Sequence, residues 1–172
     1  MAKNRHDQMT VAYNVYDSKN KLMGVTSVTL PTLEWISSTL SGAGIAGNVE
    51  VVATGMMEAM TLGMAFRMVT EAAVALAGPK QHIITLRNAQ QFLDPVAGAV
   101  GVEKVKHVFS VMPKSLNFGN VQQASPNDAS GQYAVCAWAM YIGNKCMLDI
   151  DPINGKCIVG GVDYLQYIND AL

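Results

Sequence analysis

The chain has 172 residues, of which 15% are charged and 50% are hydrophobic, and its formal net charge is −1 with a pI near 6.3. This length suits one domain with a real core, so we expect a single domain over residues 1–172. A net charge near zero provides no basic field for a nucleic acid backbone, which argues against specific DNA binding. Because so few charges cannot cover a lone globule, we expect apolar surface to be buried against further subunits.

The sequence contains no membrane-spanning or export signal that we recognise. Apolar stretches such as Met68 to Ala77 are interrupted by Thr70 and Glu71 and are shorter than the roughly 20 residues that cross a bilayer. The basic N-terminal residues precede alternating Tyr and Asn rather than an apolar block. We therefore expect the chain to be made and kept in the cytosol. Three cysteines without CxxC spacing predict buried or inert thiols: Cys136, Cys146 and Cys157.

Alternation of apolar and polar residues, separated by turn signals, indicates an antiparallel β protein. The run from Val11 to Tyr16, followed by a turn at Asp17 to Asn20, predicts a hairpin into a strand from Leu22 to Leu30. Pro31 ends that strand, and another is predicted from Leu33 to Leu40.

A glycine-rich segment follows and contains too many glycines for a strand interior. Small residues allow a close approach of two backbones, so we predict that this loop is an arm that contacts a neighbouring subunit. The segment also fits the dinucleotide-binding pattern GxGxxG, but a β-patterned run follows it where a phosphate site needs a helix N-terminus. The residues of the predicted arm are Leu40, Ser41, Gly42, Ala43, Gly44, Ile45, Ala46, Gly47 and Asn48.

Large and small residues alternate from Val49 to Val69, which predicts a strand with two unlike faces. A β-bulge at Met57-Glu58 would exchange the faces of one half, so the register stays open. The large residues should pack on a core: Val52, Met56, Met60, Leu62, Met64, Phe66 and Met68. The small ones should border a solvent space or a close neighbour: Ala53, Gly55, Ala59, Thr61, Gly63, Ala65 and Arg67.

A short central helix is predicted after this strand. Thr70 is a suitable N-cap, Glu71 suits the positive end of the helix, and Gly78-Pro79 ends it after Ala77. Strand patterns return at His82 to Leu93, Lys104 to Leu116 and Gln132 to Ile142, with an exposed polar linker from Gly119 to Gly131.

The last part of the chain predicts two short strands and a helix. The strands run from Met147 to Ile150 and from Cys157 to Val159, around a turn from Pro152 to Gly155. A helix with Asp163 as N-cap should run to Leu172 and place Leu165, Ile168 and Leu172 on one face. So short a helix needs docking, either on its own subunit or on a neighbouring subunit, where it would lock the subunits together.

The residues that could form a metal site or a catalytic site lack the partners that such a site needs. Asp149 to Gly155 partly fits a calcium loop, but the bidentate Glu is missing. His6, His82 and His107 have no partner ligands at metal-binding spacing, and Ser110 and Cys136 have no adjacent acid–base residues. We expect no enzyme activity and no cofactor or metal site.

Two segments resemble the major tail tube proteins of contractile phages and the tube subunits of R-type pyocins. The first comprises the SVTLPTL sequence from Ser27 to Leu33, then Gly42-Ala43-Gly44, Gly55 and Glu58-Ala59-Met60. The second comprises the DIDPING turn from Asp149 to Gly155, then GVDYL from Gly161 to Leu165 and NDAL from Asn169 to Leu172. The likeness between Thr70 and Tyr141 is mainly one of pattern, and charged residues of the family are missing there, which leaves the lumen charge open.

The resemblance implies a mostly antiparallel β-barrel or sandwich subunit with one short central helix and a C-terminal helix. Such subunits assemble into hexameric rings with a continuous inner β-barrel, and the rings stack into a tube that encloses a channel. The implied partners are other copies of the chain, the tail sheath protein, and the tape measure, baseplate and tail-terminator proteins, with DNA only as passing cargo in a phage. The implied location is a virion tail or a secreted phage-tail-like particle, assembled in the bacterial cytoplasm.

In such a tube, the small-residue face should line the lumen with Ala59, Thr61, Gly63, Ala65 and Arg67. Two alternatives remain open at this point. A type VI secretion tube protein shares the fold but is expected to lack the DIDPING and GVDYL ending. A small ligand-binding or catalytic β-barrel belongs to a different class and should remain a small particle at all concentrations.

Overall fold

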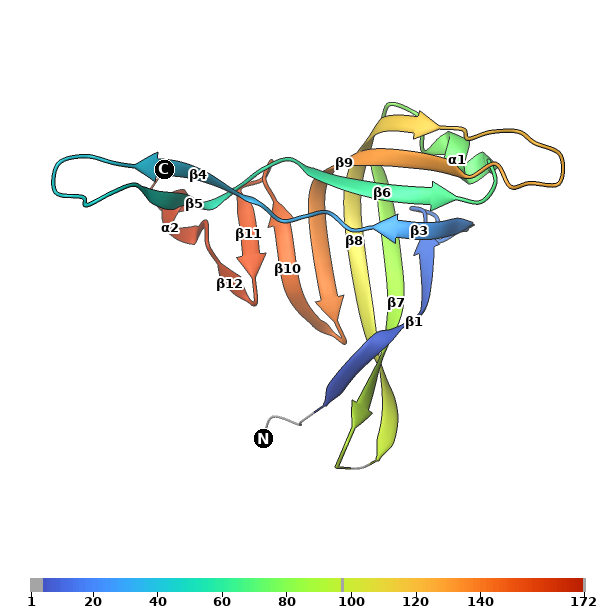
Figure 1. Ribbon diagram of the computed structural model, residues 1–172, viewed down its shortest axis with the longest axis horizontal. Helices are drawn as coiled ribbons and strands as arrows, with labels where there is room; N and C mark the ends of the chain where they lie inside the picture. Colours follow the sequence, from blue (N-terminus) through green and yellow to red (C-terminus); the bar gives the residue numbers. More distant parts are fainter. Residues whose placement is uncertain (1–4, 97, 172) are drawn as a thin grey trace.

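The computed structural model describes residues 5–96 and 98–171, which form an antiparallel β protein with two short helices (Figure 1). No helix within these residues is both long and apolar enough to cross a membrane. The strands are β1 His6–Tyr16, β2 Leu22–Met23, β3 Val25–Thr29, β4 Trp35–Leu40, β5 Val49–Met57, β6 Met60–Phe66, β7 His82–Asp94, β8 Ala99–Asn117, β9 Ala129–Ile142, β10 Lys145–Asp151, β11 Lys156–Val159 and β12 Val162–Asp163. The helices are α1 Glu71–Ala75 and α2 Gln166–Asn169.

The strands form two layers that share β9. The main sheet has the order β12-β11-β10-β9-β8-β7-β1-β2, and β6 pairs with both β9 and β3. The first half of β9 pairs with β6, its second half pairs with β10, and β8 pairs with its other edge throughout. Figure 1 shows β3 and β6 crossing over the strands of the main sheet. The sheet is not closed into a barrel, so the described part of the subunit is an open sandwich.

A bulge in β9 marks the change from one layer to the other. Ser110 of β8 pairs with Ala137, whereas Val111 pairs with Val135, so Cys136 is the extra residue. An extra residue in one strand bends it and increases its twist. Cys136 therefore lies where β9 turns from the layer of β6 into the main sheet.

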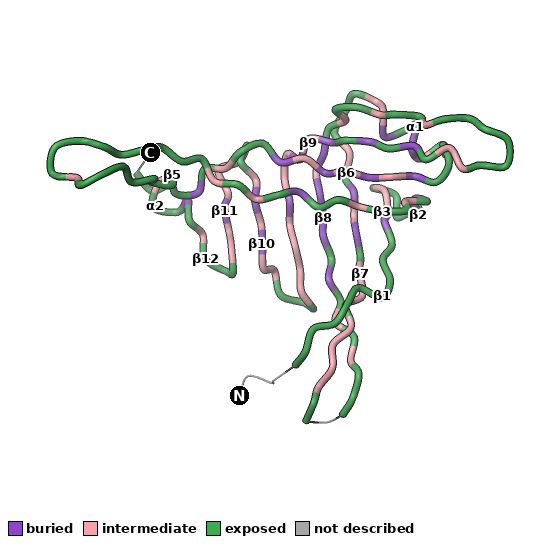
Figure 2. The backbone as a smooth tube through the Cα atoms, viewed as in Figure 1, coloured by how far each residue is buried: buried purple, intermediate pink, exposed green. Residues whose placement is uncertain are grey.

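The core lies between the two layers, where buried residues gather in Figure 2. From β6, the alternate residues Met60, Leu62, Met64 and Phe66 all point into it, with exposed fractions of at most 4%. This part of the alternation expected from the sequence is confirmed. Each such side chain contributes about 1.5–3 kcal/mol by leaving water. The main sheet meets them with Val15, Ile84, Leu86, Phe109, Val111, Trp138, Leu148 and Ile150.

The strand expected from Val49 to Val69 is in fact two strands, and its outer parts do not reach the core. Glu58 and Ala59 separate β5 from β6, and the Glu58 amide donates to the Glu34 carbonyl at 2.9 Å. Across this break the inward-facing residues change from odd numbers in β5, where Gly55 is buried, to even numbers in β6. The prediction that Val52, Met56 and Met68 pack on the core is therefore wrong, because all three are about half exposed.

The central helix forms where the sequence predicts it. The Thr70 hydroxyl oxygen accepts a hydrogen bond from the Ala73 amide at 3.3 Å, which satisfies one free donor of the first turn. The helix ends at Ala75, two residues earlier than expected, and Leu76 follows as its C-cap. Ala73 and Leu76 are buried, so α1 covers one end of the core.

The strand expected from Leu22 to Leu30 changes partner midway. β2 forms a hairpin with β1, in which the Asp17 carboxylate accepts from the Lys19 and Lys21 amides at 2.8 Å. After Gly24 the chain joins the other layer, because β3 pairs with β6. The polar linker is also shorter than expected, since β9 begins at Ala129.

Candidate assembly surfaces

A two-stranded hairpin extends away from the sandwich and is exposed along most of its length (Figures 1 and 2). We call this hairpin the arm: it consists of β4, residues 41–48 and β5. Its strands pair from Leu40 with Val49 to Ser37 with Val52. An isolated two-stranded hairpin is at best marginally stable in water, so such an arm needs a further surface to pack on. Its exposed large apolar residues are Ile36, Leu40, Val49, Val51, Val52 and Met56.

The segment Leu40 to Asn48, expected from the sequence to be an arm, forms the tip of this hairpin. Leu40 is the last residue of β4, and the rest forms the loop before β5. Gly44 and Gly47 have φ values of +92° and +126°, which glycine adopts without steric cost. A hairpin tip is not the strand–turn–helix setting of a dinucleotide site, which agrees with the rejection of that motif.

The base of the arm contacts the C-terminal segment. Leu165 is buried, and a Cβ atom added to Gly55 would lie 2.5 Å from its Cδ2 atom. Gly55 has a φ of +74° and lies where the β4–β5 pairing is interrupted. The absence of a side chain at this position therefore allows the arm and the C-terminal segment to meet. A pocket beside this contact is lined by Trp35, Val52, Thr54, Gly55, Val159 and Tyr164.

The C-terminal helix differs from the sequence prediction. Asp163 belongs to β12, where it pairs with Ile158 of β11, and its carboxylate accepts from the Leu165 amide at 3.0 Å. This bond closes a local turn, so Asp163 is not the N-cap and the helix starts at Gln166. Leu165 is the N-cap residue and has no side-chain capping bond, Ile168 is half-buried, and Leu172 lies outside the described residues.

The small-residue face of β6 points away from the core. Thr61, Gly63 and Ala65 are half-buried, and each pairs with a small or polar residue of β9. Ala59 lies in the break before β6 and Arg67 follows its end, and both are exposed. The structure therefore brings three of the five residues expected in the lumen onto one strand face. Their β9 partners on this face are Ala134, Gln132 and Ser130.

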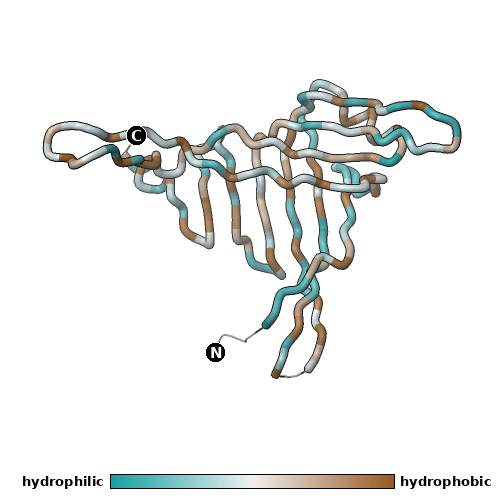
Figure 3. Tube along the Cα trace, viewed as in Figure 1, coloured by the Kyte–Doolittle hydropathy of each residue, from teal (hydrophilic) through white to brown (hydrophobic). Residues whose placement is uncertain are grey.

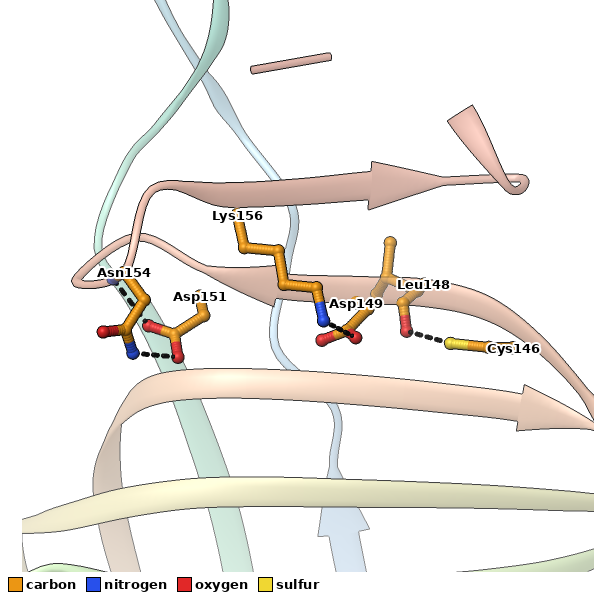
Figure 4. A network of polar contacts seen from close by, with 6 residues as sticks. All are labelled: Cys146, Leu148, Asp149, Asp151, Asn154 and Lys156. Atoms are coloured by element: carbon orange, nitrogen blue, oxygen red, sulfur yellow. Dashed lines mark hydrogen bonds and ion pairs between the residues drawn. The ribbon is translucent and has the colours of Figure 1, made fainter. Parts of the chain in front are cut away.

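The DIDPING segment is the turn between β10 and β11 (Figure 4). Asp151 accepts from the Asn154 backbone amide at 3.1 Å and from its side-chain amide at 2.6 Å. Lys156 and Asp149 form an ion pair across the two strands at 2.5 Å. The carboxylates of Asp149 and Asp151 thus have partners in the turn and across the two strands. Residues 5–96 and 98–171 contain no group of three His, Cys, Asp or Glu side chains placed to hold a metal ion.

Two titratable groups lie in the core. His107 is 3% exposed, and burial lowers its pKa; its Nδ1 atom accepts from Trp138 Nε1 at 3.4 Å. Burial raises the pKa of Tyr133 to about 12, and its hydroxyl has no hydrogen-bond partner among the described residues. Both shifts have desolvation as their cause.

A family model described as phage tail tube protein FII matches residues 8–172. No curated protein matches the chain significantly.

Two solved structures of an extracellular contractile injection system, named PVC, share the fold. The first is its sheath/tube terminator in the extended state, with a TM-score of 0.54 and 9% identity over 76% of this chain and 94% of that one. The second is a chain of its sheath-tube complex in the extended state, with a TM-score of 0.53 and 10% identity over 75% of this chain and 87% of that one. At these identities the likeness concerns the fold alone.

The family model extends from β1 to the last residue, and the open antiparallel sandwich agrees with the fold of the injection-system chains. The resemblance inferred from the sequence is thereby confirmed. The chain belongs to the phage tail tube protein FII family, and it is a structural subunit of a tail tube.

Proposed function

We propose that copies of this chain join into hexameric rings, and that the rings stack to form the inner tube of a contractile tail or phage-tail-like particle. The observation that supports this most directly is the arm, an extended hairpin with six large apolar side chains exposed to solvent. Free strand edges and exposed apolar strands are hazards for a monomer, and pairing with a neighbouring copy removes them. The number six comes from the resemblance to contractile tail tubes.

In this tube, the face of β6 with Thr61, Gly63 and Ala65 lines the lumen. These residues and their β9 partners carry no charge, so the wall they form offers little attraction to a passing polyanion or protein. The opposite face of β6 supplies the core, so only one orientation leaves the small residues at a channel. Ala59 and Arg67 extend this lining at the two ends of the strand.

The role is mechanical and requires neither catalysis nor a cofactor. The tube serves as the template for the sheath and is driven into a target envelope when the sheath contracts. Its further partners are the tape measure, baseplate and tail-terminator proteins, with DNA as cargo if the particle is a phage. The two injection-system chains come from a sheath-tube complex and a sheath/tube terminator, which supports partners of these kinds. Assembly takes place in the bacterial cytoplasm.

The test is electron microscopy and light scattering of the purified chain over a concentration series. We expect rings or tubes, and a flexible insertion after Ala46 at the arm tip should abolish them while leaving a cooperative thermal transition. An equal insertion after Gly143, in the turn between β9 and β10, controls for general loss of stability. A wild-type chain that stays monomeric at all concentrations would contradict the proposed rings and tubes. Normal tubes from the Ala46 insertion would contradict the role of the arm.

A further inference from the structure

The outward face of the main sheet carries two cations directly opposite each other. Arg87 of β7 pairs in register with Lys106 of β8, and both side chains are exposed. Directly opposed residues of antiparallel strands point to the same face, with Cβ atoms roughly 4.5–5.5 Å apart. Lys104 lies two residues along β8 and therefore points the same way. We call Arg87, Lys104 and Lys106 the cationic row.

No carboxylate in the described part of the chain forms an ion pair with this row. Glu103 precedes Lys104 but points to the other face and binds Arg5 at 2.6 Å. Asp149 shares the outward face, yet it is paired with Lys156 and lies two strands from β8, about 10 Å away.

Aromatic rings hold two of the cations in place. The Arg87 guanidinium carbon lies 5.0 Å from the centre of the Tyr16 ring, and Lys106 Nζ lies 5.5 Å from that of Tyr141. Asn14, which pairs with Arg87, donates to the Tyr16 hydroxyl at 3.3 Å. A guanidinium stacked on a ring keeps its N–H groups free at the edge, where they can bind a carboxylate through two hydrogen bonds.

Like charges directly opposite each other destabilise a sheet, so this arrangement is unfavourable for an isolated subunit. A partner that brings carboxylates would remove the repulsion and gain charge-assisted hydrogen bonds. We propose that the cationic row binds an extended acidic segment of another protein, with carboxylates at Arg87 and Lys106.

The geometry favours an acidic peptide over a nucleic acid. Single-stranded nucleic acids bind through aromatic faces on which bases stack, whereas here the cations lie over the rings of Tyr16 and Tyr141. The net charge of −1 also provides no field beyond the row itself. In the proposed tube this face lies on the side of the sandwich away from β6, so the segment would come from a protein outside the tube. That placement rests on the proposed function; the binding chemistry does not.

Fluorescence anisotropy tests this inference, with the soluble full chain and a fluorescein-labelled oligo-glutamate peptide of about eight residues as the probe. We expect saturable binding that weakens with salt, because it depends on charge pairs at the surface. The double variant R87E/K106E should lose at least about tenfold in affinity, as expected when two charge-assisted contacts are reversed. The single variant K106Q, which cannot introduce a new ion pair with Arg87, should lose a smaller part.

The control variant K19E/K80E changes the net charge equally at two exposed lysines outside the row. Its affinity should stay within about twofold of the wild type, since distant surface charges contribute little. No binding of the peptide, equal loss in the two double variants, or tighter binding of an oligothymidylate of equal charge would overturn the inference. Assembled tubes that no longer bind the probe would show that a neighbouring copy occupies the row instead. Peptide binding by a chain that forms no tubes would separate this inference from the proposed function.

Discussion

The contact between Gly55 and Leu165 gives the sharpest prediction about how the arm is held. Gly55 has a φ of +74°, and a Cβ atom there would lie 2.5 Å from Leu165 Cδ2 and 2.7 Å from its Cγ. Gly55→Ala therefore imposes two separate penalties, one on the backbone and one on packing. The left-handed conformation costs an alanine about 1–2 kcal/mol. Overpacking against Leu165 adds about 1–3 kcal/mol.

The two penalties can be separated by a double-mutant cycle. Leu165→Ala alone removes a buried side chain and should cost about 2–5 kcal/mol. In the Leu165→Ala background the added methyl group at Gly55 finds room, so only the backbone penalty of about 1–2 kcal/mol should remain. The double variant should then be more stable than the sum of the single effects by about 1–3 kcal/mol, which is the coupling expected of residues in contact.

Urea unfolding of the four soluble proteins measures this coupling, with circular dichroism and tryptophan fluorescence as two probes. Trp35 lies in the pocket beside the contact and reports the base of the arm, while Trp138 reports the core. Additive effects within about 0.5 kcal/mol would refute the contact, because residues that do not touch behave in that way. If the fluorescence of Trp35 changes at a lower urea concentration than the far-ultraviolet circular dichroism does, the arm detaches before the sandwich unfolds.

The remaining predictions concern the channel and the core. Thr61→Cys should react with a small thiol reagent in assembled tubes. Met64→Cys should stay protected, since Met64 is 3% exposed in the subunit. The reverse pattern would show that the faces of β6 are exchanged. Burial lowers the pKa of His107, so the unfolded chain should bind a proton at this residue at a higher pH than the folded chain does. The free energy of unfolding should therefore fall as the pH drops below about 6.5, by up to about 1.4 kcal/mol per pH unit. His107→Gln should flatten this dependence, and an unchanged slope in urea titrations from pH 7 to pH 5 would assign it to other groups.

The sequence predicts well those elements that depend on residues close to one another in the chain. Thr70 caps α1 because its hydroxyl reaches an amide three residues on, and the alternation from Met60 to Phe66 follows from the period of a strand. The error at Val52 and Met56 has a different origin. Alternation indicates a strand but does not reveal whether the strand packs on a core or extends from it, because that depends on tertiary contacts.

Two further errors have different causes, one a local hydrogen bond and the other the pairing of strands. Asp163 has the residue type of an N-cap, but its carboxylate closes a turn at Leu165 while its backbone pairs with β11. The strand around Gly24 reads as continuous, although its two halves pair with different layers. The cationic row could not be predicted at all, because Arg87 and Lys106 become neighbours only through the register of β7 with β8.

The distribution of exposed apolar residues bears on the kind of assembly that the subunit can form. They occur not only on the arm but also in the first half of β1 and at the start of β8. The end of the β7–β8 hairpin extends from a different side of the sandwich than the arm does (Figure 1) and includes hydrophobic residues (Figure 3). A closed dimer uses one self-complementary patch on each subunit, which would leave one of these two extensions uncovered. Head-to-tail contacts bring two different surfaces together at every interface, and they close into rings or continue as a helical tube. The few charged residues of the chain thus leave exposed apolar residues in two separate regions. Two such regions favour a ring or a tube over a dimer. The exposed apolar residues in the first half of β1 and at the start of β8 are Met9, Val11, Val100 and Val102.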